Sequence, residues 1–347
     1  MRVSLRRSFS AQLLAVVLAC SSVSWGWGNA GHEAVAYVAW QQLTPETRTR
    51  VIALLMQVPT LQSPEHKTVP GYNDWVKDLP AGLSDDDKNL YLFMRAATWP
   101  DTIKHVGFED SDNPPKGVTQ DVNIGYSDTK SHGYWHFVDA GFASDGSTVP
   151  PTPAPNAETQ IAAFRLAISS DEKDDLKSYD LVWLEHMVGD IHQPLHGTAR
   201  YFQNKGDEGG NLVVIKLTPA MKKKFEGTVS KSAPQELHAF WDDLPGEGTP
   251  VSALPVALAF AKRLGNAPAD KVADADPSDW AMESFTIAKT DAYARPIGKS
   301  PQPAGSTSKS AGYLITVAYY NKAMQDAQNQ VALAGARLAK LLNENLK

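Results

Sequence analysis

Apolar residues recur three or four positions apart along most of this chain, which is the spacing of one face of an α-helix. The longest such segment, residues 313–346, is rich in alanine. Shorter segments with the same pattern cover residues 31–56, 157–168, 176–190, 251–264 and 280–292. Thr44-Pro45 is expected to divide the first of them into two helices, because this pair is typical of a helix start. The clearest strand signal is 212–215, after the Gly209-Gly210 turn. These patterns predict a mainly α-helical fold with a short β-hairpin.

Three irregular stretches rich in Gly, Pro, Asp or Ser interrupt the helical pattern, at residues 105–131, 141–156 and 296–312. Each is long enough to be a linker between domains. The apolar segments on their two sides look alike, however, and loops of this length in compact proteins are often functional. We therefore expect residues 27–347 to form a single compact domain with long surface loops.

The first 26 residues resemble a signal peptide. Arg2, Arg6 and Arg7 precede the apolar stretch 13–20, and small residues at 24 and 26 favour cleavage before Trp27. The apolar stretch is shorter than the roughly 20 residues that span a bilayer, so a secreted or periplasmic protein is expected. Two alternatives remain open. Arg6-Arg7 also resembles a twin-arginine signal, and residues 17–20 weakly resemble a lipoprotein cleavage box, in which lipidation of Cys20 would leave Trp27 internal.

Removal of this leader changes what can stabilise the protein. Cys20 is the single cysteine, so the 321 remaining residues cannot form an intramolecular disulfide and must rely on a sizeable core or on bound metal. Loss of the three arginines lowers the formal net charge from −6 to −9. An acidic protein lacks the basic surface of a stoichiometric nucleic-acid binder. If its substrate is a polyphosphate, metal ions must supply the local positive charge.

Histidine and aspartate recur together in a pattern typical of metal ligands. Two His–Asp pairs have the four-residue spacing that places both side chains on one helix face, and three further histidines lie in apolar stretches. The pairs are His186 with Asp190 and His238 with Asp242, and the other histidines are His32, His136 and His196. One such pair alone is commonly a surface pair or a hydrogen-bonded core histidine. Together they favour a multinuclear site, and imidazole and carboxylate donors without thiolate suit zinc.

Six short stretches, in this order, resemble the S1/P1 nuclease family. They are Trp27-Gly-Asn-Ala-Gly-His32, Trp99-Pro-Asp101, Trp135-His-Phe-Val-Asp139, His186-Met-Val-Gly-Asp190-Ile-His-Gln-Pro-Leu-His196, Gly209-Gly-Asn211 and Leu237-His-Ala-Phe-Trp-Asp242. The resemblance continues through Tyr319-Tyr320 and residues 335–339, and so covers 27–347. It implies a mostly helical fold with three zinc ions in one cleft.

Matched residue by residue, the resemblance implies a ligand set for each ion. The first zinc would take Asp101, His136, His186 and Asp190; the second Trp27, His32 and Asp190; the third His196, His238 and Asp242. Trp27 would bind through its α-amine and carbonyl oxygen. Because an amide nitrogen has no usable lone pair, this requires Trp27 to be the N-terminus. The remaining histidines, His66, His105, His132 and His192, match no ligand, although His192 lies between two of them and is a candidate to support the ligands.

The implied activity is hydrolysis of single-stranded DNA and RNA to 5′-phosphate products, together with 3′-nucleotidase activity on nucleotides. Asp101 would orient the attacking water, and Lys104 would face the phosphate. Phe137 would stack on a base, while Asp139 and Asn211 would bond to base edges. The protein is expected to be a monomer without an obligatory protein partner or membrane attachment.

Some features leave room for other interpretations. The stretch between His196 and His238 is longer than in fungal members, and its lysines 222–224 either steer nucleic acid or are simply solvated. A zinc-dependent phospholipase C is the alternative enzyme, since it uses a similar Trp-led site. Against it, no amphipathic or aromatic-rich loop stands out as a lipid-binding surface. A periplasmic zinc-storage protein is the non-enzymatic alternative, but the chain lacks the His-rich tract typical of one.

Overall fold

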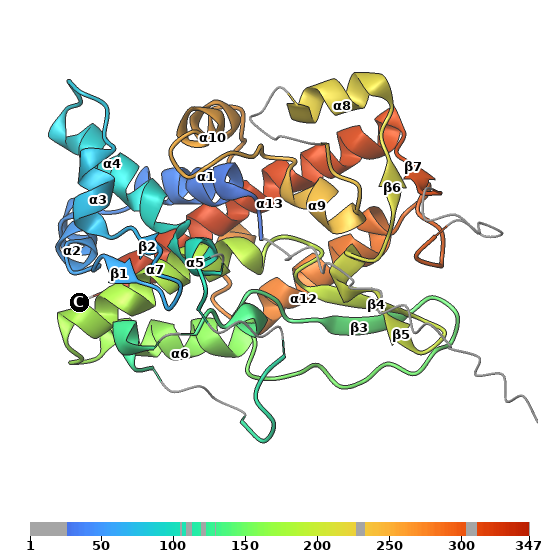
Figure 1. The fold of residues 1–347 in the computed structure, drawn as a ribbon, viewed down its shortest axis with the longest axis horizontal. Coiled ribbons are helices and arrows are strands. Elements are labelled where there is room, and N and C mark those ends of the chain that lie inside the picture. Colours follow the sequence, from blue (N-terminus) through green and yellow to red (C-terminus); the bar gives the residue numbers. More distant parts are fainter. Residues whose placement is uncertain are drawn as a thin grey trace, which may run out of the picture.

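Three helices form the centre of the protein. The computed structural model describes residues 26–104, 106–108, 113–118, 123–128, 130–226, 233–302 and 311–346. Helix α1 (Asn29–Trp40) packs against both α7 (Asp174–Asp190) and α13 (Val317–Asn345), and α13 also contacts α7. Figure 1 shows α1, in blue, beside the long red α13. The first and last helices are therefore neighbours, and the mainly α-helical fold class is confirmed.

Glycines on both neighbouring helices let α1 approach closely. A Cβ atom at Gly335 of α13 would lie 2.5 Å from Cβ of Val38 and 2.8 Å from the carbonyl oxygen of Val35. A Cβ atom at Gly189 of α7 would lie 2.8 Å from Nδ1 of His32. Glycine inside a helix costs about 1 kcal/mol relative to alanine. Here the absence of side chains at Gly189 and Gly335 lets α1 place His32 against the C-terminal turn of α7.

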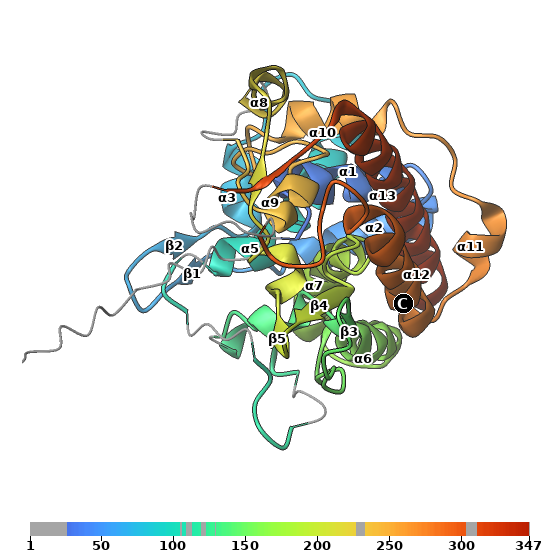
Figure 2. The ribbon, with the colours of Figure 1, turned by 90° about the vertical axis from the view of Figure 1, so that its right-hand side faces the viewer.

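Shorter helices enclose this centre. Those that pack on it are α2 (Pro45–Leu55), α4 (Asp85–Ala96), α5 (Trp99–Ile103), α6 (Ala157–Ser169), α10 (Leu254–Ala261) and α11 (Ala269–Ala273). Helix α12 (Pro277–Ile287) packs on α6, and α3 (Tyr72–Lys77) on α4. Helices α8 (Pro219–Glu226) and α9 (Leu237–Asp242) complete the set. Figure 2 shows α11, α12 and α13 together on one side of the molecule.

The strands are short and lie outside the helical centre. Strands β1 (Leu61–Gln62) and β2 (Thr68–Val69) form an antiparallel hairpin, as do β4 (Thr198–Phe202) and β5 (Lys205–Gly206). Strand β3 (Ala140–Ala143) runs parallel to β4, and β6 (Ile215–Lys216) runs parallel to β7 (Tyr313–Leu314). The strand predicted at 212–215 is correct only for its second half, because Val214 forms a β-bridge with Glu236 and Ile215 lies in β6. The backbone of Leu212 and Val213 instead bonds back to Asp207 and Gly210 in a turn, so that only Ile215 enters β6.

Several helix boundaries differ from those that the sequence predicts. Thr44 does separate α1 from α2, because its side chain accepts a hydrogen bond from the Thr47 amide. Helix α13 begins at Val317 rather than at 313, because Thr316 caps it and the preceding residues form β7. Helix α10 spans only residues 254–261, and α12 ends at Ile287 before a π-helical turn, Ala288–Ala292. The sequence did not predict helix α4, because its first turn, Asp85-Asp86-Asp87, has no apolar residues at helical spacing.

The described residues form an extensive core, as expected of a chain without disulfides. Its largest fully buried side chains include Trp27, Trp135, Trp183 and Trp241. No helix in the described ranges is both long and apolar enough to cross a lipid bilayer. Cys20, His105 and the first 25 residues lie outside the described part, so the signal peptide and the domain start at residue 27 stay predictions.

The packing at Gly335 predicts that Gly335→Ala destabilises the protein, although alanine is the better helix former. The added methyl group would overlap Val38 and the backbone of α1, and such overpacking costs about 1–3 kcal/mol. Urea unfolding of Gly335→Ala and of the unsubstituted parent protein measures the difference in their free energies of unfolding. Asn321→Ala, at an exposed position of the same helix, is the control and should change the free energy of unfolding by less than about 0.5 kcal/mol. Equal stability of Gly335→Ala and the parent would contradict this packing account.

Candidate metal centre

Three groups of buried histidines and aspartates lie near the ends of α1, α5, α7 and α9. Within each group, one donor atom per residue lies within 4.8 Å of the others. The groups are His32, His186 and Asp190; Asp101, His136 and His186; and His196, His238 and Asp242. The structure thus brings together all eight side chains that the sequence nominates as ligands. The first two groups share His186.

Asp190 lies at the centre of this arrangement. Its Oδ1 atom is 3.3 Å from Nε2 of His32, while its Oδ2 atom is 2.9 Å from Nδ1 of His136 and 3.2 Å from Nε2 of His186. Asp190 is the last residue of α7, and His186 lies one turn earlier on the same face. The two oxygens therefore face different histidines, which suits a carboxylate that bridges two cations.

Backbone carbonyls orient three of the histidines. The Nδ1–H groups of His186, His196 and His238 donate to the carbonyl oxygens of Ala97, His136 and Gly209, at 2.7, 2.6 and 2.8 Å respectively. Each bond leaves the lone pair on Nε2 for the interior of the site. The Nε2 atoms of His196 and His238 then face each other at 3.0 Å. Two lone pairs at this distance repel each other unless a cation or proton lies between them.

Other atoms in the site that could ligate a metal ion form no hydrogen bond with the described residues. They are both ring nitrogens of His32, both carboxylate oxygens of Asp101, Nε2 of His136 and Oδ1 of Asp190. Each buried polar atom left without a partner costs about 1–3 kcal/mol. Coordination of cations would satisfy all of these donors at once, so the residues present fit a metal centre.

The ionisation of Asp190, Asp101 and His136 matches what metal ligands need. Burial alone raises the pKa of Asp190, but the charges on His186 and His196 and the hydrogen bond from His136 outweigh it and hold that pKa well below its usual range. Burial also raises the pKa of Asp101, but the charges of His186, Lys104 and His136 outweigh burial and lower that pKa to about 2. Burial lowers the pKa of His136 to about 3. Ionised carboxylates and neutral imidazoles are the forms that bind metal ions. Burial instead raises the pKa of Asp242 well above its usual range. At His186 burial lowers the pKa, but the charges of Asp190 and Asp101 outweigh burial and raise it.

Gln193 supports the third group, a role that sequence reasoning missed. Its side-chain amide donates to Oδ1 of Asp242 at 2.6 Å, which leaves Oδ2 of Asp242 3.5 Å from Nε2 of His238. Its own amide oxygen accepts from the backbone of Leu195. The available signal was its position between Asp190 and His196, in the most distinctive stretch of the sequence.

The N-terminal end of the described chain enters the same site. The Trp27 ring is fully buried, and the amide of Gly28 donates to the carbonyl oxygen of Asp242 at 3.0 Å. A Cβ atom at Gly26 would lie 1.6 Å from Oδ1 of Asp190 and 2.8 Å from Nε2 of His32. The residue before Trp27 therefore occupies space next to two of the nominated ligands.

Of the residues expected to contact substrate, Lys104 lies beside these groups. Lys104 is buried, and its Nζ atom is 3.3 Å from Oδ1 of Asp101. Phe137, the residue after His136, and Asp139, three residues after it, are half-buried. Asn211 follows the turn whose Gly209 carbonyl accepts a hydrogen bond from His238. Lys104 is thus not the solvated surface lysine that its residue type would normally indicate.

The other histidines lie outside the three groups. His66 is exposed, and His132 bonds to Asp128 and Tyr134 and stacks on Trp135. His192 bonds to Arg337. None of the three belongs to a group of candidate ligands.

Comparison with known proteins identifies the family. The sequence model described as S1/P1 Nuclease matches residues 27–347. The chain belongs to the S1/P1 nuclease family. It is 24% identical to nuclease S1 of Aspergillus oryzae over 263 residues, which is 72% of this chain and 65%, just under two thirds, of that protein. It is 23% identical to nuclease P1 of Penicillium citrinum over 334 residues, 92% of this chain and 97% of that protein. A Penicillium nuclease PA3 matches over the same shares, also at 23% identity.

A metal centre in this S1/P1 nuclease family member predicts that a chelator lowers its melting temperature and that added zinc restores it, because a cation bound only by the folded state stabilises that state. His238→Ala should reduce the shift that zinc produces. His66→Asn is the control, since this exposed histidine lies outside the three groups. Differential scanning calorimetry with and without chelator checks this; a melting temperature indifferent to both reagents would contradict it.

Proposed function

We propose that residues 27–347 form a zinc-dependent nuclease, exported by a signal peptide that is cleaved before Trp27 and active outside the cytoplasm. It hydrolyses single-stranded DNA and RNA to 5′-phosphate products and acts on nucleotides as a 3′-nucleotidase. The observation that carries the proposal is the set of eight buried histidine and aspartate side chains, in a chain of the S1/P1 nuclease family. We further propose that it works as a monomer without an obligatory protein partner.

Three zinc ions are the proposed cofactors, and imidazole and carboxylate donors without thiolate favour zinc. Asp101, His136, His186 and Asp190 would hold the first ion, and His196, His238 and Asp242 the third. The second would be held by His32, Asp190 and the α-amine and carbonyl of Trp27. The position of Gly26 against Asp190 and His32 supports this assignment, because cleavage before Trp27 would free that space and create the amine together.

Bound zinc would lower the pKa of water and neutralise the charge that develops on phosphorus and on the departing 3′-oxygen. Because the pKa of Asp101 is about 2, its carboxylate is ionised near neutral pH. It can then accept hydrogen bonds but cannot donate them. That property suits orientation of the attacking water. Lys104, 3.3 Å from Asp101, adds a cation that can donate to a phosphate oxygen.

Binding of single strands would depend on unpaired bases. Phe137, the residue after His136, is half-buried, and its ring is proposed to stack on a base, an interaction that tolerates every base. Asp139 and Asn211 are proposed to bond to base edges. Stacking of this kind requires an unstacked base, and so disfavours duplex substrates.

The first test is a comparison of substrates. We expect chelator-sensitive release of acid-soluble nucleotides from single-stranded DNA and RNA, little release from duplex DNA, and no cleavage of phosphatidylcholine. Lys104→Met should lower kcat/KM on single strands about 10- to 1000-fold while zinc content stays unchanged. Cleavage of phosphatidylcholine alone would overturn the proposal in favour of a phospholipase C.

The second test concerns the N-terminus. A chain that begins at Trp27 should bind three zinc ions, whereas one that begins at Gly26 should lack one of them, because its residue 27 offers an amide nitrogen. Zinc content by mass spectrometry of the native proteins, together with nuclease activity, gives the result. A fully loaded and active chain that begins at Gly26 would contradict the role proposed for the Trp27 amine.

A further inference from the structure

Arg337 of α13 is buried, with 1% of its surface exposed. A guanidinium group in the interior must be paired and hydrogen-bonded, or its burial is strongly destabilising. Its Nε and one terminal nitrogen donate to the carbonyl oxygen of Lys271, at 3.1 and 2.9 Å. Its other terminal nitrogen donates to Glu283 at 2.8 Å and to Nε2 of His192 at 2.9 Å. The bond to His192 links α13 to the stretch that carries the candidate ligands.

The direction of this bond is fixed by the second ring nitrogen of His192. The Nδ1–H group donates to the carbonyl oxygen of Val188 at 2.7 Å, so Nε2 has a lone pair that accepts. Arginine can only donate. Arg337 therefore holds His192 in one tautomer and one orientation, between α13 and the C-terminal turn of α7.

Side chains from α12 and α13 also bind the turn that follows α7. Residues 191–195 connect Asp190, at the end of α7, with His196. Ser284 donates to the carbonyl oxygen of Ile191 at 2.6 Å, and Gln330 donates to that of His192 at 3.0 Å. On its other side, the turn presents Gln193 to Asp242 and ends at His196. The turn thus has one face held by α12 and α13 and one face that supports the third ligand group.

We propose that Arg337 is a positioning residue for the metal centre, which acts through His192 to fix turn 191–195 and so the third group, His196, His238 and Asp242. This inference rests on the proposed zinc-dependent function. Asp190 belongs to α7, and the helix itself sets its position. Gln193 and His196 lie beyond the helix, so their positions depend on the turn. Loss of the bond to His192 should therefore weaken the third zinc and spare the two that Asp190 contacts.

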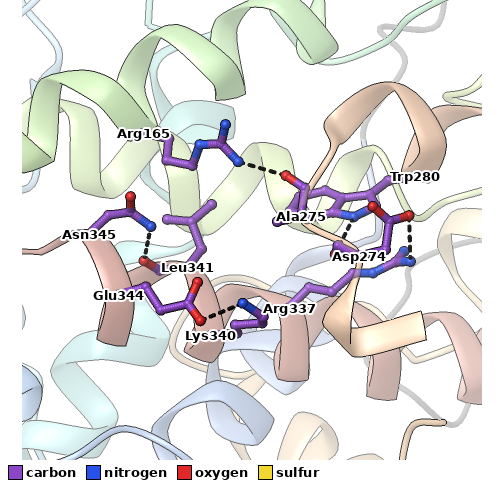
Figure 3. A pocket seen from close by; sticks show the side chains of 9 residues that line it. All are labelled: Arg165, Asp274, Ala275, Trp280, Arg337, Lys340, Leu341, Glu344 and Asn345. Atoms are coloured by element: carbon purple, nitrogen blue, oxygen red, sulfur yellow. Dashed lines mark hydrogen bonds and ion pairs between the residues drawn. The ribbon is translucent and has the colours of Figure 1, made fainter. Parts of the chain in front are cut away.

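A surface pocket of about 110 Å³ lies on the outer side of Arg337. Figure 3 shows Arg337 in this pocket beside Trp280 and Asp274, with Lys340 and Arg165 nearby. The guanidinium also lies over the Trp280 ring, 5.2 Å from its centroid. Truncation of Arg337 would leave a space that joins this pocket. Guanidinium ion from solution can enter such a space and replace the missing donors.

The experiment uses chains that begin at Trp27 and follows zinc loss during titration with a chelator. Arg337→Ala should release one of its three zinc ions at a free chelator concentration about 10- to 100-fold lower than the unsubstituted chain requires. This is the range typical of losing a residue that orients a metal ligand. The other two ions should be released as in the parent. Millimolar guanidinium should restore the affinity of the weakened site, whereas urea at the same concentration should not. Lys340→Ala, in the same pocket and paired in the parent with Glu344, is the control and should behave as the parent.

Two further variants keep the test decisive. Arg337→Lys retains a cation but cannot span Lys271, Glu283 and His192 together, and should show the same selective loss if Arg337→Ala does not fold. His192→Phe removes the acceptor, and Arg337→Ala added to it should cause no further loss of zinc. Parental affinity in both Arg337 variants, equal weakening of all three ions, or a folded Arg337→Ala that guanidinium does not restore would overturn the inference. Failure of the parent to bind zinc would instead overturn the proposed function.

Discussion

The two oxygens of the Asp190 carboxylate determine how this site is organised. Oδ1 faces His32 from α1, and Oδ2 faces His136 and His186. A single carboxylate placed in this way joins donors from segments more than a hundred residues apart in the chain. Burial raises the pKa of this carboxylate, but the neighbouring histidines outweigh burial and hold that pKa well below its usual range. The candidate metal centre therefore depends on the fold, since the helices must pack closely enough to place these ligand side chains around one residue.

Close packing of α1 meets that requirement. Gly189 and Gly335 remove the side chains that would separate α1 from α7 and α13. The N-terminal residues then lie against Asp242, through the bond from Gly28. An N-terminus held at this point is what a role for the Trp27 amine needs, and so export, processing and metal binding would all depend on one peptide bond.

Much of the site was predictable because its spacing is local. His186 with Asp190 and His238 with Asp242 lie four apart on helices, and helical geometry alone places each pair on one face. The first helix boundary was likewise predictable from Thr44-Pro45. Contacts between distant segments were not. No local pattern shows that Arg337 reaches His192, that Gln193 holds Asp242, or that residues 313–314 pair with β6 instead of starting the last helix. Helix α4 was missed because its acidic first turn carries no apolar period.

We propose that Asp190 bridges two zinc ions and that a third lies among His196, His238 and Asp242. X-ray diffraction from crystals of the chain that begins at Trp27, measured on both sides of the zinc absorption edge, locates these ions. Three anomalous peaks are expected, two of them on either side of the Asp190 carboxylate and one beside His238. A single peak, or peaks away from these side chains, would contradict this proposal.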